Sequence, residues 1–147
     1  MLGSLAKWLR ILGFDTFYSN TAHDNQLLEI IWRENRILLS KDMRLVEGVR
    51  PDQRLRIHSK YLPQQLKQVV EYFQLDGNID LFSRCSECNV MVELIPKMLV
   101  ADKVPEYVFD KYEQFWVCPT CRRIFWPGTH RELAVKWLAK HAIAYIE

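Results

Sequence analysis

Two Cys-x-x-Cys pairs constrain this 147-residue chain more than any other feature of its sequence. The pairs are Cys85 with Cys88 and Cys118 with Cys121, and they contain every cysteine of the chain. Two such pairs supply the four thiolates of a tetrahedral structural zinc site, although the segment between them is longer than usual. Loop-closure entropy grows slowly with loop length, so the longer segment costs little. We therefore predict that the four thiols hold Zn²⁺ in a zinc ribbon.

Two disulfides or a redox-active dithiol are the alternatives for these cysteines. The sequence does not open with a charged region followed by an apolar one, as the leader of a protein bound for an oxidising compartment would. A thioredoxin-like dithiol is a single pair at the start of a helix, whereas here two pairs flank a long segment. The spacing therefore favours zinc over both alternatives.

The composition is that of a globular protein with a hydrophobic core. Apolar residues make up 49% of the chain, and no apolar run approaches the roughly 20 residues that span a bilayer. The net charge of +2 neither requires nor excludes a nucleic-acid partner. We expect a soluble intracellular protein, cytoplasmic by default, with no membrane partner.

The first half of the sequence alternates helical and strand patterns. Apolar residues recur at helical spacing in residues 2–12, and Gly13 supplies the left-handed residue that ends many helices. Residues 14–18 are aromatic and extended, and a second helix is expected to end near Asn35. Residues 36–42 contain the apolar run Ile37-Leu38-Leu39 and stop on an acid, which predicts a parallel strand buried on both faces.

A turn-forming segment at residues 76–78 divides the sequence into two parts. Before it, residues 55–57 predict another strand, and Pro63 suits the first turn of a helix. We predict an α/β core over residues 1–76 and a zinc ribbon with a C-terminal helix over residues 77–147.

The second part is expected to hold the strands of the ribbon. Residues 90–94 and 115–117 have strand-forming composition. Thr129 and Glu132 fit a capping box, so we predict that the terminal helix starts there. We expect that helix to pack back on the body of the protein.

Asp42 is the leading candidate for chemistry because it ends the predicted buried strand. Ligands of open α/β sheets bind beyond the carboxyl ends of the strands. Asp24, near the start of the preceding helix, is expected to point into the same crevice. Paired carboxylates suit Mg²⁺ or Mn²⁺, which activate water and stabilise the charge on a phosphodiester under attack.

Both acids also have purely structural explanations. Asp42 is placed to cap the helix that follows it, and Asp24 to cap its own helix, alone or in a box with Thr21. Lys41 and Arg44 flank Asp42, where they would contact a phosphate or tune the charge of the acid. The residue pattern alone leaves both explanations open.

Four segments in chain order resemble the Mut-seven C-terminal ribonuclease family, which is similar to PIN-domain nucleases with a fused zinc ribbon. They are residues 1–15, residues 36–42, the two cysteine pairs and residues 126–130. The resemblance implies a PIN-like, Rossmann-like parallel sheet, metal-dependent hydrolysis of RNA, and a ribbon that is structural or helps to hold nucleic acid. It also implies that Asp24 and Asp42 are acidic site residues.

One departure from that family concerns the N-terminus. Family members carry a strand ending in Asp immediately before the segment that matches residues 2–6, and a sequence that starts at Met1 leaves no room for it. Without that acid we expect weaker metal binding. Without the strand, its neighbours keep unpaired backbone groups, at about 1–3 kcal/mol for each buried group. This departure predicts either a start at a downstream methionine or a catalytically impaired form.

Other residues near the second cysteine pair have less specific explanations. Four thiolates fill a zinc shell, so His130 is expected to cap a helix or support a ligand. Trp116 and Trp126 are expected in the core rather than stacked on bases. Basic residues are also dense here, and either contact phosphates or lie in solvent: Arg122, Arg123, Arg131, Lys136 and Lys140.

The sequence supports two main functional hypotheses. The first is a PIN-like ribonuclease that depends on Mg²⁺ or Mn²⁺, acts on single-stranded RNA at Asp24 and Asp42, and contains structural Zn²⁺. The alternative is a catalytically impaired zinc module that binds nucleic acid or another protein. A zinc-dependent scaffold without an RNA partner is a third hypothesis.

Overall fold

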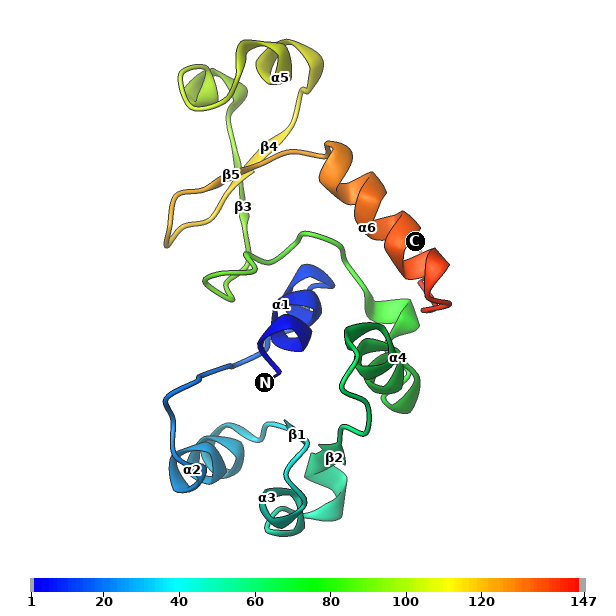
Figure 1. The fold of residues 1–147 in the computed structure, drawn as a ribbon. Helices are drawn as coiled ribbons and strands as arrows, with labels where there is room; N and C mark the ends of the chain where they lie inside the picture. Colours follow the sequence, from blue (N-terminus) through cyan, green and yellow to red (C-terminus); the bar gives the residue numbers. More distant parts are fainter. Residues whose placement is uncertain (1, 146–147) are drawn as a thin grey trace.

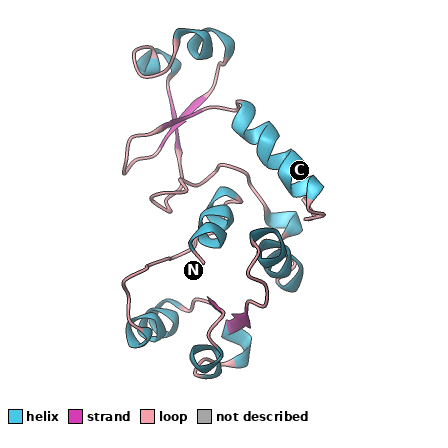
Figure 2. Ribbon diagram, viewed as in Figure 1, coloured by secondary structure: helices cyan, strands magenta, loops and turns pink. Residues whose placement is uncertain are grey.

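The computed structural model describes residues 2–145, in which helices surround two small separate sheets (Figure 1). The start at Met1, which bears on the expected loss of a strand, lies outside the described residues. Figure 2 shows how short the strands are beside the helices and loops. None of the helices among the described residues is long and apolar enough to cross a bilayer.

The first half of the chain alternates helices and strands, as predicted. Its elements are α1 (Gly3–Ile11), α2 (Asp24–Glu34), β1 (Leu38–Ser40), α3 (Met43–Glu47), η1 (Pro51–Gln53), β2 (Arg54–Arg56), α4 (Leu62–Tyr72) and η2 (Asp76–Asn78). Strands β1 and β2 pair in parallel, with Leu39 opposite Leu55. The prediction of an α/β chain with a parallel sheet is confirmed.

The strand predicted over residues 36–42 is shorter in the structure, where β1 spans only Leu38–Ser40. The Asp42 carboxylate accepts hydrogen bonds from the N–H groups of Arg44 and Leu45, so the chain turns there from strand to helix α3. The extended residues 14–18 belong to no sheet.

The second half of the chain forms an antiparallel three-stranded sheet in the order β3-β4-β5. Its elements are β3 (Glu93–Ile95), η3 (Lys97–Val100), α5 (Glu106–Lys111), β4 (Phe115–Val117), β5 (Ile124–Phe125) and α6 (Thr129–Lys140). The strand predicted at residues 90–94 begins later, because the Cys85 N–H donates to the Val90 carbonyl in a turn (2.9 Å). The strand at residues 115–117 is confirmed.

Helix α6 begins at Thr129, but the predicted capping box is wrong. The residue at the N-cap is Gly128, and no side chain caps the helix. A Cβ at position 128 would lie 2.9 Å from the indole nitrogen of Trp126, so close packing against this ring favours glycine over a capping side chain.

The main hydrophobic core joins both halves of the chain. Helix α6 returns past the ribbon to α1 and α4 (Figure 1), and the predicted packing of the terminal helix on the body is confirmed. The core residues come from α1, β2, α4, α6 and the segments beside them: Leu5, Leu9, Leu12, Leu55, Ile57, Leu66, Val69, Val70, Ile79, Leu81, Leu138 and Ile143. The boundary between residues 1–76 and 77–147 stays a prediction.

A smaller core lies under the ribbon sheet. It contains Val100, Val104, Val108 and Phe115, with Trp126 packed against it. The expectation that Trp126 belongs to the core is therefore confirmed. The Trp126 ring centroid lies 6.4 Å from that of Phe115.

We predict that Leu138→Ala lowers the free energy of unfolding by about 2–5 kcal/mol, because Leu138 is 1% exposed in the main core. Leu133→Ala is the matched control on the same helix, since Leu133 is 62% exposed and should cost less than about 0.5 kcal/mol. Urea denaturation of both variants measures the difference. Equal losses would show that α6 does not contribute to the core as described.

Candidate functional site

The two cysteine pairs lie in turns with the same backbone pattern. In the first turn, the Asn89 N–H donates to the Cys85 carbonyl (2.9 Å). In the second, the Arg122 N–H donates to the Cys118 carbonyl at the same distance. Asn89 and Arg122 both have left-handed backbone conformations, with φ of 61° and 65°. Each pair is thus held in a tight turn that directs both of its thiols toward the other pair.

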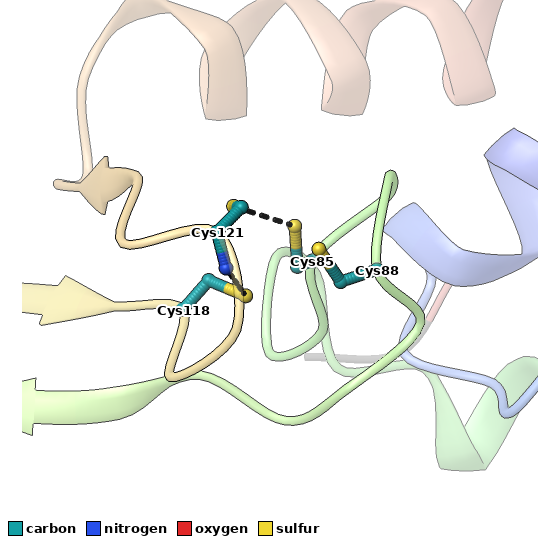
Figure 3. Close-up of side chains that lie close together, drawn as sticks. All are labelled: Cys85, Cys88, Cys118 and Cys121. Atoms are coloured by element: carbon teal, nitrogen blue, oxygen red, sulfur yellow. Dashed lines mark hydrogen bonds between the residues drawn. The ribbon is translucent and has the colours of Figure 1, made fainter.

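The four thiols converge on one point between the two turns (Figure 3). Their Sγ atoms all lie within 4.8 Å of one another, and those of Cys85 and Cys121 are 3.9 Å apart. Tetrahedral zinc with Zn–S bonds of about 2.3 Å requires sulfur atoms about 3.8 Å apart. The four cysteines therefore fit one Zn²⁺ ion. Four thiolates leave no open position, so the site suits a structural role rather than a catalytic one.

The metal-free thiols have strongly divided pKa values. Burial alone would raise the pKa of the Cys118 thiol, but the N–H groups of Cys121 and Thr120 and the neighbouring thiols lower it to about 7. Burial and the thiols of Cys121 and Cys118 raise the pKa of Cys88 to about 12. Zinc binding must therefore release protons from this cluster, as zinc sites of thiolates generally do.

His130 takes no part in this cluster. It lies exposed in the first turn of α6, and the only group of metal-ligand side chains found among residues 2–145 is the set of four cysteines. This agrees with the expectation that four thiolates fill the shell.

The structure places Asp42 at the junction of β1 and α3, where it caps α3. Its Oδ1 accepts from the Arg44 N–H at 2.9 Å and from the Leu45 N–H at 3.4 Å, and its own N–H donates to Ser40 Oγ at 3.0 Å. Its Oδ2 has no partner within the described part of the chain. The cap thus fixes the orientation of an exposed carboxylate at the carboxyl end of β1.

Asp24 is the first residue of α2 and is exposed. It does not cap that helix, because the residue at the N-cap is His23, whose N–H donates to Gln26 Oε1 at 2.7 Å. The structure records no contact between Asp24 and Asp42, and neither belongs to a group of three metal-ligand side chains among the described residues. Their joint role stays a prediction.

Lys41 and Arg44 flank Asp42 on the chain. Arg44 is exposed and Lys41 partly exposed. Neither side chain makes an ion pair within the described residues, so both charges are available to a ligand.

A cavity of about 1130 Å³ lies beside β1 and reaches Ser40 and Lys41. Its apolar walls come from α1, α2, α4 and the C-cap of α4: Leu5, Leu9, Ile31, Val69 and Phe73. Its polar side is formed by residues 15–20 and by residues 34–36. The cavity is large enough for a ligand and ends immediately before the candidate carboxylate.

The edge of strand β1 that does not pair with β2 faces this cavity. The Ile57 N–H donates to the Ser40 carbonyl, so Ser40 directs its backbone groups toward β2. In a parallel ladder alternate residues face the same neighbour, so the backbone groups of Leu39 face away from β2. Leu39 lines the cavity, and no second strand pairs with β1 among residues 2–145.

Sequence reasoning missed a network that joins the first candidate metal-binding turn, residues 85–89, to the α/β part. Its members are Arg10, Asp15, Thr16, Arg36, Arg84 and Asn89. The two members farthest apart in the sequence, Arg10 and Asn89, are separated by 79 positions. The one local signal was Asn89 itself, because asparagine directly after a Cys-x-x-Cys pair suits a left-handed turn.

One family model, described as the Mut7-C RNAse domain, matches residues 1–138. No curated protein and no solved structure is similar enough to the chain to count as a match.

We predict that the purified chain binds one zinc ion and that Cys85→Ser and Cys118→Ser each abolish this stoichiometry, because three thiolates hold the metal far less tightly. Ser86→Ala is the control within the first turn, since its hydroxyl makes no hydrogen bond to any residue from 2 to 145. Elemental analysis and titration of released thiols measure the metal content. Folded wild-type protein without metal would contradict the prediction.

Proposed function

Because the chain belongs to the Mut7-C RNAse domain family, we propose that it is a ribonuclease that hydrolyses RNA phosphodiester bonds with Mg²⁺ or Mn²⁺ held at a carboxylate site. The family match over residues 1–138 carries the proposal. The exposed carboxylate of Asp42 beside the large cavity supports it.

Asp42 and Asp24 are the proposed carboxylates of this site. The α3 cap occupies only Oδ1 of Asp42, and its Oδ2 is left for a cation within a fixed geometry. Asp24 adds a second exposed carboxylate from the first turn of α2. Oxygen donors of this kind suit Mg²⁺ and Mn²⁺. When bound, such a cation supplies an activated water and stabilises negative charge on the phosphodiester.

Lys41 and Arg44 are the proposed contacts to the phosphate groups of the substrate. Their charges are unpaired within the described residues and lie on either side of Asp42. Phe17 and Tyr18 line the cavity and are 46% and 38% exposed. Exposed aromatic rings stack on unpaired bases, so we propose single-stranded RNA as the substrate.

A second candidate function is a nucleic-acid-binding module with an incomplete nuclease site. Two observations from residues 2–145 favour it: neither Asp24 nor Asp42 belongs to a group of three metal-ligand side chains, and β1 has a strand neighbour on one side only. Such a module would keep the affinity of Lys41 and Arg44 for phosphates without hydrolysing RNA.

We predict that Asp42→Asn lowers Mn²⁺-dependent cleavage of single-stranded RNA at least about hundredfold, more than the loss of a group that only supports a metal ligand. Asparagine caps helices as well as aspartate does, so this variant should keep the stability of α3. The control is Asp52→Asn, because Asp52 is exposed and, among the described residues, pairs only with Arg50. Cleavage is measured on labelled RNA, with the unfolding midpoint of each variant.

Cleavage that survives in Asp42→Asn would contradict the carboxylate site. A version of the chain preceded by a strand that ends in Asp is tested beside it. If only that version cleaves RNA, while both versions bind it with the same salt dependence, the second candidate function describes the present chain.

A further inference from the structure

The first metal-binding turn is attached to the end of α1 by side-chain hydrogen bonds. Arg10 Nη1 donates to the Ser86 carbonyl inside the turn at 3.0 Å. In the opposite direction, Arg84 Nε donates to the Gly13 carbonyl at 3.3 Å. Arg84 Nη1 also donates to the Asn89 carbonyl at 2.8 Å. The turn that carries Cys85 and Cys88 is therefore fixed on the segment that leads out of α1.

The side-chain amide of Asn89 adds two hydrogen bonds to this attachment. Its Oδ1 accepts from the Thr16 N–H at 2.9 Å, and its Nδ2 donates to Asp15 Oδ1 at 2.8 Å. Asn89 directly follows Cys88, and its N–H closes the metal-binding turn on the Cys85 carbonyl. A change in the turn must therefore move the groups that hold residues 15 and 16.

Asp15 in turn contacts Arg36, which lies just before β1. Its two oxygens accept from the two terminal nitrogens of Arg36, at 3.2 and 3.1 Å. Arg36 lies two residues before Leu38, the first residue of β1. Partial burial raises the pKa of Asp15, but the hydrogen bonds from Arg36 and Asn89 together lower it by more than burial raises it. The pKa of Asp15 therefore lies below its ordinary value. The carboxylate thus stays charged in both of its contacts.

We propose that Asn89 is a positioning residue that transmits metal binding at the four cysteines to β1 and to Asp42 at its end. The connection runs from the metal-binding turn through Asn89 and Asp15 to Arg36, and then along β1. Asp15 and Arg36 also line the cavity beside β1, so the same contacts hold its polar side. The inference rests on the proposed function only in treating Asp42 as a site residue.

The metal-binding turn does not itself require the side chain of Asn89. A left-handed residue with φ of 61° is needed at this position, and glycine adopts that conformation more readily than asparagine. Asn89→Gly therefore keeps the turn but removes both side-chain hydrogen bonds. The matched control is Gln74→Gly, because Gln74 is also left-handed (φ 53°) and exposed, and its side chain makes no hydrogen bond within the described part of the chain.

The experiment is amide hydrogen exchange on the full chain, with and without a zinc chelator. In wild type, chelation should speed exchange about tenfold at Thr16 and at residues 38–42, as expected when one or two hydrogen bonds stop protecting a group. Zinc-loaded Asn89→Gly should exchange as fast there as chelated wild type while still holding one zinc ion. Zinc-loaded Gln74→Gly should exchange as slowly as zinc-loaded wild type.

A second variant separates the effects of the two hydrogen bonds that the Asn89 side chain makes. Asn89→Asp keeps an acceptor for the Thr16 N–H but places a carboxylate against Asp15, so exchange should rise at residues 38–42 and not at Thr16. The proposal fails if zinc-loaded Asn89→Gly and Asn89→Asp both exchange like Gln74→Gly. It also fails if chelation leaves residues 38–42 of wild type unchanged. These readouts need no RNA, so they stand apart from any failure of the nuclease proposal.

Discussion

The convergence of four thiols between two metal-binding turns is the constraint on which the rest of this structure depends. The ribbon strands have only two or three residues each, and the core beneath them is small. Such a sheet has little buried area of its own, so a metal ion held by the four thiols would replace a larger core. Joining the two turns also closes the chain between them, which brings α6 back to the main core through Leu138 and Ile143.

The α/β part has the complementary arrangement, with a substantial core and a small sheet. Strands β1 and β2 make one parallel pair, and half of the buried residues of the main core come from helices α1, α4 and α6. Parallel strands normally lie inside a sheet that is covered on both faces. Here one edge of β1 faces the cavity, so the strand that leads to Asp42 is held from one side by β2 and at its start by Arg36. The contacts that run from the turn of Cys85 and Cys88 through Asp15 to Arg36 therefore reach a strand that pairs, in the described part of the chain, with β2 alone.

Features set by local spacing were predictable from the sequence. The cysteine pairs, the helix ended by Gly13 and the parallel strand before Asp42 all follow from patterns within a few residues, and the structure has each of them. The cap of α6 was mispredicted by one residue, because Gly128 rather than Thr129 is the N-cap, and a sequence pattern does not fix a helix boundary to a single residue. The Asn89 network was missed because its partners are distant in sequence, and no periodicity marks a pair such as Asn89 and Asp15.

Asp42 shows why a structural role and a chemical role need not exclude each other. The cap of α3 uses one oxygen, and asparagine or serine would serve it as well. A negative charge adds little to so short a helix, because the dipole of five residues is small. The cap therefore does not account for the second oxygen or for the charge at this position. What it does provide is a fixed orientation, which lowers the entropy lost when a carboxylate binds a cation. The cap is thus better understood as the support of a binding group than as an alternative to it.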